Sequence, residues 1–188
     1  ILIWFSLIFV SGINLIFFLS FFGLVSIVLS YIILFIPKFD YIQKRLFYFL
    51  DPNSGNNYQS EKASEAISNG GFFGKGIGEG TLNSRIPEAH TDYIISVISE
   101  EFGILIVILI MLILLIFSYQ VLRKINLESD NKAKLILVGS ITIILLQAFI
   151  HIGVNIRFLP TTGMTLPFLS YGGSSIISTA ILSGIILN

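Results

Sequence analysis

The residue types best suited to chemistry lie in one short stretch, IPEAHTDYIISVISEE. It opens with Glu88, His90 and Asp92, becomes apolar, and ends with Glu100 and Glu101 in front of a long apolar run. An aspartate here fits two roles equally well: a general base, or a cap for the positive end of a helix. Carboxylates deep in an apolar segment are costly and usually face a protein interior or a wet cavity. We expect Glu100 and Glu101 to pair with basic groups on neighbouring spans.

Polar residues recur at helical spacing on two segments of the chain. On a helix that begins near residue 91, three polar or small residues lie within about 40° of Asp92 around the axis: Ser96, Ser99 and Gly103. In a later run without charges, three are spaced by four: Gln147, His151 and Asn155. We expect His151 to be a hydrogen-bonded packing residue. With one other histidine in the chain, a zinc site is not expected.

The elements that carry these residues are strongly apolar. Hydrophobic residues make up 54% of the chain and charged residues 12%, about half the charged share of an ordinary globular protein. Residues 1–37, 102–122, 135–156 and 158–188 contain no charged side chain. Each run exceeds the roughly 18 apolar residues that indicate a membrane span. The sequence therefore predicts an all-α, polytopic integral membrane helical bundle.

We predict five spans, at about 1–11, 15–37, 92–118, 135–156 and 174–188. The first 37 residues would form about 55 Å of helix, nearly twice the hydrocarbon thickness, so a break is expected at Ser11–Asn14. The connection 119–134 carries four Lys and Arg residues, which places it in the cytoplasm. The large segment 39–90 and the segment 157–173 would then face outward.

Other features limit the function classes. The absence of cysteine excludes disulfides and Cys-ligated metals, and a net charge of zero without a basic run gives no indication of nucleic acid binding. The chain begins at Ile1 without a basic signal-peptide region and stops at Asn188 within an apolar run. We therefore expect a fragment truncated at both ends.

Two glycine-containing segments could shape a site. GGFFGKGIGEG, at 70–80, matches neither the dinucleotide fingerprint nor a P-loop, so we interpret it as a flexible turn whose Lys75 could face an anionic ligand. RFLPTTGMTLPFLSYGGSS, at 157–175, combines prolines, glycines and hydroxyls between two spans. Such backbone is tolerated at membrane depth where it lines a cavity, and we interpret it as a cavity lid.

Together these stretches resemble the SEDS family of membrane glycosyltransferases (FtsW, RodA, SpoVE). The resemblance rests on RLFYFLDPNSGNNYQSEKASEAISNGGFFGKGIGEG, PEAHTDYIISVISEEFG and LPTTGMTLPFLSYGGSS, in this order. The alanine in PEAHTD favours the FtsW-like branch. The resemblance implies a parent of ten spans, of which this chain covers roughly the sixth to the tenth. Thr162 departs from the lysine that many FtsW sequences carry there.

The resemblance implies a peptidoglycan glycosyltransferase that extends glycan strands from lipid II during cell division. It places the protein in the bacterial cytoplasmic membrane, enriched at the division site. It implies as partners a class B penicillin-binding protein, which supplies the transpeptidase, and other divisome proteins. The family's essential aspartate falls on Asp92.

This chemistry can be written with the residues of the chain. Pyrophosphate is a good leaving group, so a single base suffices, and we expect Asp92 to deprotonate the 4-hydroxyl of the acceptor sugar. Lys75, Arg85 and Arg157, or a divalent cation (Mg²⁺ or Mn²⁺), would stabilise the departing pyrophosphate. No residues are predicted as metal ligands. The remaining predicted substrate-binding residues are Gln59, Glu88, His90, Thr91, Ser170, Ser174 and Ser175.

Two other function classes remain open. Polar stripes inside spans also fit a flippase that transports lipid II, although the third span is uniformly apolar from Ile104 to Phe117, which favours an outward-facing site. A non-catalytic scaffold that recruits the transpeptidase is the other alternative. Variants that are inactive but still recruit the transpeptidase and support division would favour the scaffold over the glycosyltransferase and the flippase.

Overall fold

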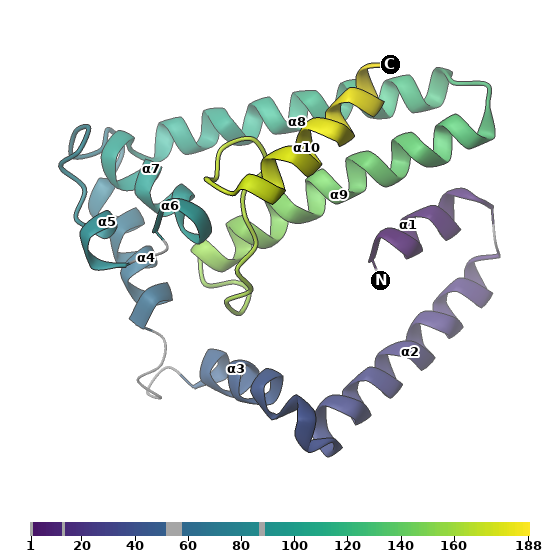
Figure 1. Cartoon of the computed structure of the whole chain (residues 1–188), viewed down its shortest axis with the longest axis horizontal. Helices are drawn as coiled ribbons and strands as arrows, with labels where there is room; N and C mark the ends of the chain where they lie inside the picture. Colours follow the sequence, from purple (N-terminus) through teal and green to yellow (C-terminus); the bar gives the residue numbers. More distant parts are fainter. Residues whose placement is uncertain (1, 13, 52–57, 87–88) are drawn as a thin grey trace.

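The computed structural model describes residues 2–12, 14–51, 58–86 and 89–188, and in these ranges every regular element is a helix (Figure 1). The elements are α1 (Leu2–Val10), α2 (Leu15–Phe35), the 3-10 helix η1 (Pro37–Phe39), α3 (Asp40–Leu50), α4 (Tyr58–Gly70), α5 (Leu82–Arg85), α6 (Ala89–Asp92), α7 (Ile94–Phe102), α8 (Ile104–Leu127), α9 (Asn131–Asn155) and α10 (Gly173–Leu187).

Helices α8 and α9 form an antiparallel pair along the molecule, and α1 and α10 both pack against α9 (Figure 1). Among the described residues, three helices are long and apolar enough to cross a membrane: Ile16–Phe35, α8 and α9. Helix α10 is a shorter apolar helix. The prediction of an all-α, polytopic membrane bundle is confirmed.

The expected break near residue 12 is present. Helix α1 ends at Val10, and the side chain of Asn14 accepts a hydrogen bond from the backbone N–H of Ile16 at 3.1 Å, which caps α2. Helix α2 ends at Phe35, just before Pro37. No described side chain of α2 is buried, and α2 and α3 form an arm beside the bundle in Figure 1.

The prediction of one helix over 92–118 is wrong. The chain turns at Tyr93 and again at Gly103, whose φ of +84° is a conformation that favours glycine. A Cβ at Gly103 would lie 2.2 Å from the carbonyl oxygen of Phe72, and Gly71 O accepts a hydrogen bond from the backbone N–H of Ile104 at 3.0 Å. The close approach of the 71–80 segment therefore separates α7 from α8.

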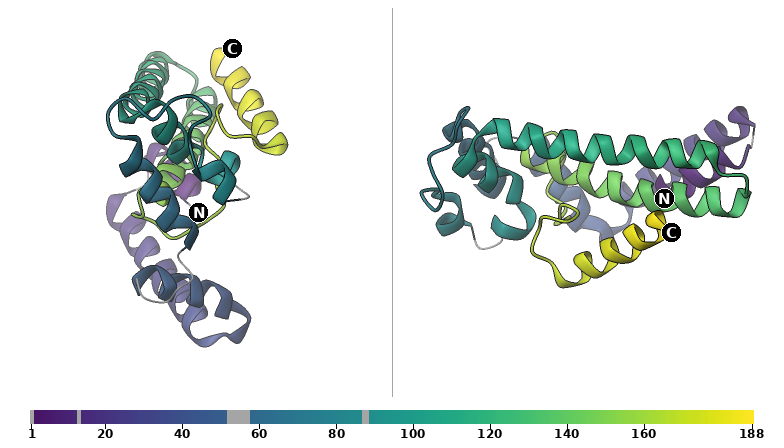
Figure 2. Two further views of the ribbon diagram at one scale, coloured as in Figure 1. Left: turned by 90° about the vertical axis from the view of Figure 1, so that its left-hand side faces the viewer. Right: turned by 90° about the horizontal axis from the view of Figure 1, so that it is seen from above.

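Two segments that were predicted as loops are largely helical. Helix α8 continues to Leu127, so only residues 128–130 connect it to α9 instead of the predicted 119–134. The predicted loop 39–90 contains α3, α4 and α5 in its described part, and α4 packs along α7. Figure 2 (right) shows α4 to α7 gathered at the end of the molecule where α8 begins. The side of the membrane on which each connection lies stays a prediction.

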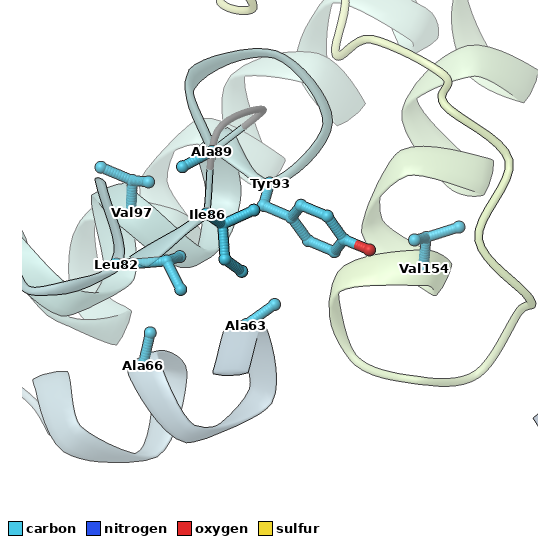
Figure 3. Close-up of a cluster of buried hydrophobic side chains, with 8 residues drawn as sticks. All are labelled: Ala63, Ala66, Leu82, Ile86, Ala89, Tyr93, Val97 and Val154. Atoms are coloured by element: carbon cyan, nitrogen blue, oxygen red, sulfur yellow. The ribbon is translucent and has the colours of Figure 1, made fainter. Parts of the chain in front are cut away.

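A buried apolar cluster joins this group of short helices to α9. It contains Ala63, Ala66, Leu82, Ile86, Ala89, Tyr93, Val97 and Val154 (Figure 3). Two alanines of α4 allow a close approach of that helix, and the ring of Tyr93 extends from the α6–α7 junction toward Val154 of α9. Tyr93 is only 2% exposed. This cluster fixes the position of the residue immediately before Tyr93, which is Asp92.

Candidate active site around Asp92

The one-turn helix that carries Asp92 is held by hydrogen bonds to three consecutive carbonyls. His90 O accepts from the backbone N–H of Tyr171 at 3.3 Å, Thr91 O from the hydroxyl of Ser170 at 2.8 Å, and Asp92 O from the side-chain amide of Asn155 at 3.1 Å. The last carbonyls of a helix have no partner within it, so they need external donors. Here α9 and the segment after it supply those donors, which fixes the backbone at Asp92.

Asn155 connects the two polar faces that the sequence predicted. Its Oδ1 accepts hydrogen bonds from the hydroxyl of Ser96 at 2.6 Å and from the backbone N–H of the same residue at 3.2 Å. Its Nδ2 donates to Asp92 O and also to His151 O at 2.8 Å. Asn155 and Ser96 are both fully buried. The contact sets the height of α7 relative to α9.

His151 holds the opposite wall of the site. Its Nδ1 lies 2.8 Å from the carbonyl oxygen of Met164, so this nitrogen carries the proton and donates. His151 is completely buried and is a hydrogen-bonded packing residue, as predicted. It anchors the segment that faces Asp92.

A cavity of about 120 Å³ lies beside Asp92. Its lining residues come from five segments: Arg45, Gln59, Asp92, Tyr93, Val154, Thr161, Thr162, Gly163 and Met164. A Cβ at Gly163 would lie 3.5 Å from Oδ2 of Asp92, so this glycine is next to the carboxylate. Part of Asp92 is exposed, and a hydroxyl group of a ligand in this cavity could reach it.

A larger and more cationic cavity of about 400 Å³ adjoins the first. Both have Arg45 and Thr161 in their walls, and the guanidinium of Arg45 donates to Thr161 O at 2.8 Å. Lys44 and Arg157 complete a set of three cations around the larger cavity, which Tyr41, Tyr48 and Phe49 line on the α3 side. The arrangement places a carboxylate next to a surface that carries three cations.

The whole chain, residues 1–188, matches the family model described as cell cycle protein, FtsW/RodA/SpoVE. The chain belongs to the FtsW/RodA/SpoVE family. Proteins named probable peptidoglycan glycosyltransferase FtsW are similar to it. The one from Geobacter metallireducens is 36% identical over 170 residues, or 88% of this chain and 45% of that protein. The one from Legionella pneumophila is 37% identical over an alignment of 191 positions, which covers 97% of this chain and 47% of that protein.

A solved structure supports the same relationship. It is described as "structural coordination of polymerization and crosslinking by a peptidoglycan synthase complex", and it matches 97% of this chain with a TM-score of 0.73 and 26% identity. The match covers 51% of that chain. The present chain thus spans about half the length of the FtsW relatives it matches.

The residues that the FtsW/RodA/SpoVE resemblance assigned to substrate do not all reach Asp92. Gln59 lines the Asp92 cavity, and Arg157 lines the neighbouring one while its guanidinium lies 3.7 Å from the carboxylate of Glu61. Arg85 is exposed and belongs to a separate crevice with Glu65. Arg85 is therefore not a cation of the Asp92 site.

The hydroxyl residues have mainly structural contacts. Ser170 is 3% exposed, and its hydroxyl accepts from the backbone N–H of Leu166 at 2.8 Å in addition to its bond to Thr91 O. Ser175 Oγ accepts from the hydroxyl of Thr165 at 2.7 Å. Ser174 is exposed at the start of α10. These contacts shape the segment that covers the site.

Near Asp92, two further predicted residues belong to the same helix turn. His90 is exposed, and its ring centroid lies 6.0 Å from that of Tyr171. Thr91 is partly buried and contributes the carbonyl that Ser170 contacts. Glu88 lies outside the described residues. Substrate contacts of all these residues stay predictions.

Glu100 is a buried support, although its partners differ from those expected. Its carboxylate forms a 2.8 Å ion pair with Lys75 and accepts from the backbone N–H groups of Thr81 and Leu82, each at 3.0 Å. These partners lie in the 71–82 segment, not on a neighbouring span, so that expectation was wrong. Burial raises the pKa of Glu100, but the Lys75 and backbone hydrogen bonds outweigh it, and the net pKa lies below 4.5. Lys75 is thus engaged away from the Asp92 cavity.

Tyr93, Arg45 and Lys44 are site residues that sequence reasoning did not assign. Burial, and then the neighbouring Asp92 carboxylate, raise the pKa of Tyr93 to about 12, so its hydroxyl stays protonated at neutral pH. Arg45 opens the RLFYFLDP motif, and its guanidinium lies 4.4 Å from the ring centroid of Tyr41. Its position at the start of that motif could have indicated Arg45 as a site residue from the sequence.

We searched the described residues for clusters of side chains that could ligate a metal ion. Among them, no group of three or more His, Cys, Asp or Glu side chains is arranged to hold a metal ion.

Proposed function

We propose that the protein polymerises lipid II into glycan strands by glycosyl transfer, with Asp92 as the general base. One observation carries this proposal: the carboxylate of Asp92 lines a cavity that shares Arg45 with a larger cavity containing three cations. The names of the FtsW relatives support the same activity. Because the chain spans about half of those relatives, the proposal concerns the full-length protein.

The transfer requires one base. The 4-hydroxyl oxygen of the acceptor sugar attacks the anomeric carbon of the donor and forms the new glycosidic bond. The bond from that carbon to the pyrophosphate oxygen breaks, and its electron pair leaves with the pyrophosphate. The hydroxyl proton passes to the carboxylate of Asp92, and the anomeric configuration inverts. A glycosidase needs a second carboxyl group to protonate its leaving group, which pyrophosphate does not require.

The larger cavity suits the departing pyrophosphate. Lys44, Arg45 and Arg157 supply positive charge where negative charge develops, which lowers the barrier. Lys75 and Arg85, predicted earlier for this role, lie outside both cavities. The proposed steps do not use a divalent cation such as Mg²⁺ or Mn²⁺.

The proposed setting is the cytoplasmic membrane at the division site, with the Asp92 cavity at its outer face. A class B penicillin-binding protein would crosslink the strands, and other divisome proteins would complete the assembly. The similarity to a chain of a peptidoglycan synthase complex supports a partnership of this kind.

An Asp92→Asn variant tests the proposal in a lipid II polymerisation assay with the full-length protein and its partner. We expect polymerisation to be abolished while folding and membrane insertion persist. Asp130→Asn is the matched control, because asparagine caps a helix as well as aspartate does and this residue lies at the other end of α9. Full activity of Asp92→Asn would contradict the proposed base.

The alternative functions predict other outcomes. Transport of lipid II by a wild-type protein that does not polymerise it would favour a flippase. Cell division supported by inactive variants would favour a scaffold.

A further inference from the structure

The 71–80 segment, called the glycine loop below, exposes three large apolar side chains. Phe72 is 71% exposed, Phe73 84% and Ile77 80%. The loop lies at the end of the molecule where α8 begins, seen in Figure 2 (right). An exposed cluster of this kind normally marks an interaction surface.

The backbone of the glycine loop is fixed to the junction between α7 and α8. The N–H groups of Lys75 and Gly76 donate to the carbonyls of Glu100 and Glu101 at 2.9 Å and 3.0 Å. A Cβ at Gly74 would lie 2.2 Å from Glu101 O, so the two backbones touch. The sequence predicted a flexible turn, but these contacts hold the two phenylalanines in a defined position.

The position of the loop corresponds to a membrane boundary. Gly103, whose backbone touches Phe72, and Arg123, near the other end of α8, are 20 residues apart. At about 1.5 Å per residue this separation is roughly 30 Å, the thickness of the hydrocarbon core. If Arg123 lies at one interface, Phe72 lies at the opposite one.

The surface of α8 beside the loop is exposed and apolar. Only 17% of the most apolar part of α8 is buried, and Phe102 and Leu105 next to the loop are exposed. The single cation of the loop, Lys75, is paired with Glu100, which lowers the cost of placing the loop near lipid. Phenylalanine and aliphatic side chains are among those that interfacial segments bury at the boundary between headgroups and acyl chains.

We propose that the glycine loop is a membrane-interface anchor, in which Phe72, Phe73 and Ile77 enter the interfacial layer of the leaflet where α8 begins. The exposed apolar side chains of the loop continue the exposed apolar face of α8, a helix long enough to cross a membrane. This continuity favours lipid over a protein partner around the loop. Because the loop is bound to the segment that follows Asp92, the anchor sets the depth of the Asp92 cavity relative to the membrane surface. The inference does not depend on the proposed reaction.

Spin-label accessibility tests this proposal. Single cysteines replace Phe73 or Ile77 in the full-length protein, reconstituted alone into phosphatidylcholine–phosphatidylglycerol vesicles and labelled with a nitroxide. Both side chains are exposed, so labelling leaves the fold intact. Leu109→Cys on α8 is the lipid reference, and Ser68→Cys on α4, which is also exposed, is the water reference.

We expect the ratio of collisions with oxygen to collisions with a water-soluble nickel chelate at both loop positions to exceed the Ser68 ratio several-fold and to approach that of Leu109. A ratio equal to that of Ser68 overturns the anchor. Low collision rates with both reagents also overturn it, because they show that protein covers the loop.

Discussion

The side-chain amide of Asn155 donates a hydrogen bond to the backbone carbonyl of Asp92, 3.1 Å away, while its carbonyl oxygen accepts from Ser96. One buried side chain on α9 thus fixes both sides of the turn at Tyr93. The carboxylate of Asp92 projects from a backbone that three neighbouring groups hold in place. Preorganisation of this kind is what a general base needs, because a small misplacement of a reacting group is costly in rate.

Replacement of Asn155 should separate its two functions. Asn155→Ala removes buried hydrogen bonds to Asp92 O, Ser96 and His151 O, and we expect a loss of about 2–3 kcal/mol in stability with a large loss of polymerisation activity. Asn155→Asp keeps the acceptor for Ser96 and loses the donor to Asp92. Thermal unfolding in detergent and the polymerisation assay measure both effects. An unchanged melting temperature for Asn155→Ala would show that the network is not structural.

Gly103→Ala should destabilise the junction between α7 and α8. The backbone there has a φ of +84°, and the new Cβ would overlap Phe72 O, so the strain alone is of order 1–3 kcal/mol. Gly184→Ala is the matched control: no atom lies within 4 Å of its Cβ position in α10, and we expect a gain of about 0.5–1 kcal/mol. Equal melting temperatures for the two variants would refute the assigned role of Gly103.

The stability of the protein should depend on pH through Glu100. Since the folded-state pKa lies below the ordinary value of 4.5, ionised Glu100 stabilises the fold at and above that pH. The contribution decreases as pH falls from about 4.5 through the folded-state pKa. Glu100→Gln should therefore lose about 1.5–3 kcal/mol at neutral pH and show a flatter stability profile in acid. The measurement is the free energy of unfolding of wild type and variant between about pH 5 and about pH 3, the range in which linkage predicts the change. Equal pH dependence of the two proteins would contradict the assigned role of Glu100.

Two arginines should respond differently to the same substitution. Arg45 borders both cavities and Arg85 borders neither, although the sequence favoured Arg85. Loss of a hydrogen bond to a charged group costs about 1.5–3 kcal/mol, so Arg45→Met should lower kcat/KM for polymerisation roughly 10- to 100-fold. Arg85→Met should retain nearly full activity. The reverse order would move the anion-binding surface to the crevice beside Glu65.

The sequence by itself determined the membrane class, the break between α1 and α2 and the assignment of His151 to packing. These follow from local patterns: long uncharged runs, a capping residue and a single histidine on an apolar helix. It also singled out Asp92 as the predicted base, because the resemblance of the neighbouring motifs favoured that role over a helix cap. Pattern alone could not show that Gly103 ends a helix, since the cause is the approach of Phe72, about thirty residues earlier in the chain.

Only the tertiary structure decided which groups meet at Asp92. Periodicity places Ser96 and Asn155 on polar faces of separate helices, but the 2.6 Å bond between them depends on how α7 and α9 pack. Other contacts between distant segments turn Lys75 toward Glu100 and bring Arg45, 47 residues before Asp92, to the wall of its cavity. A side chain's type and helical spacing are local properties, whereas its partner is set by contacts between segments far apart in sequence.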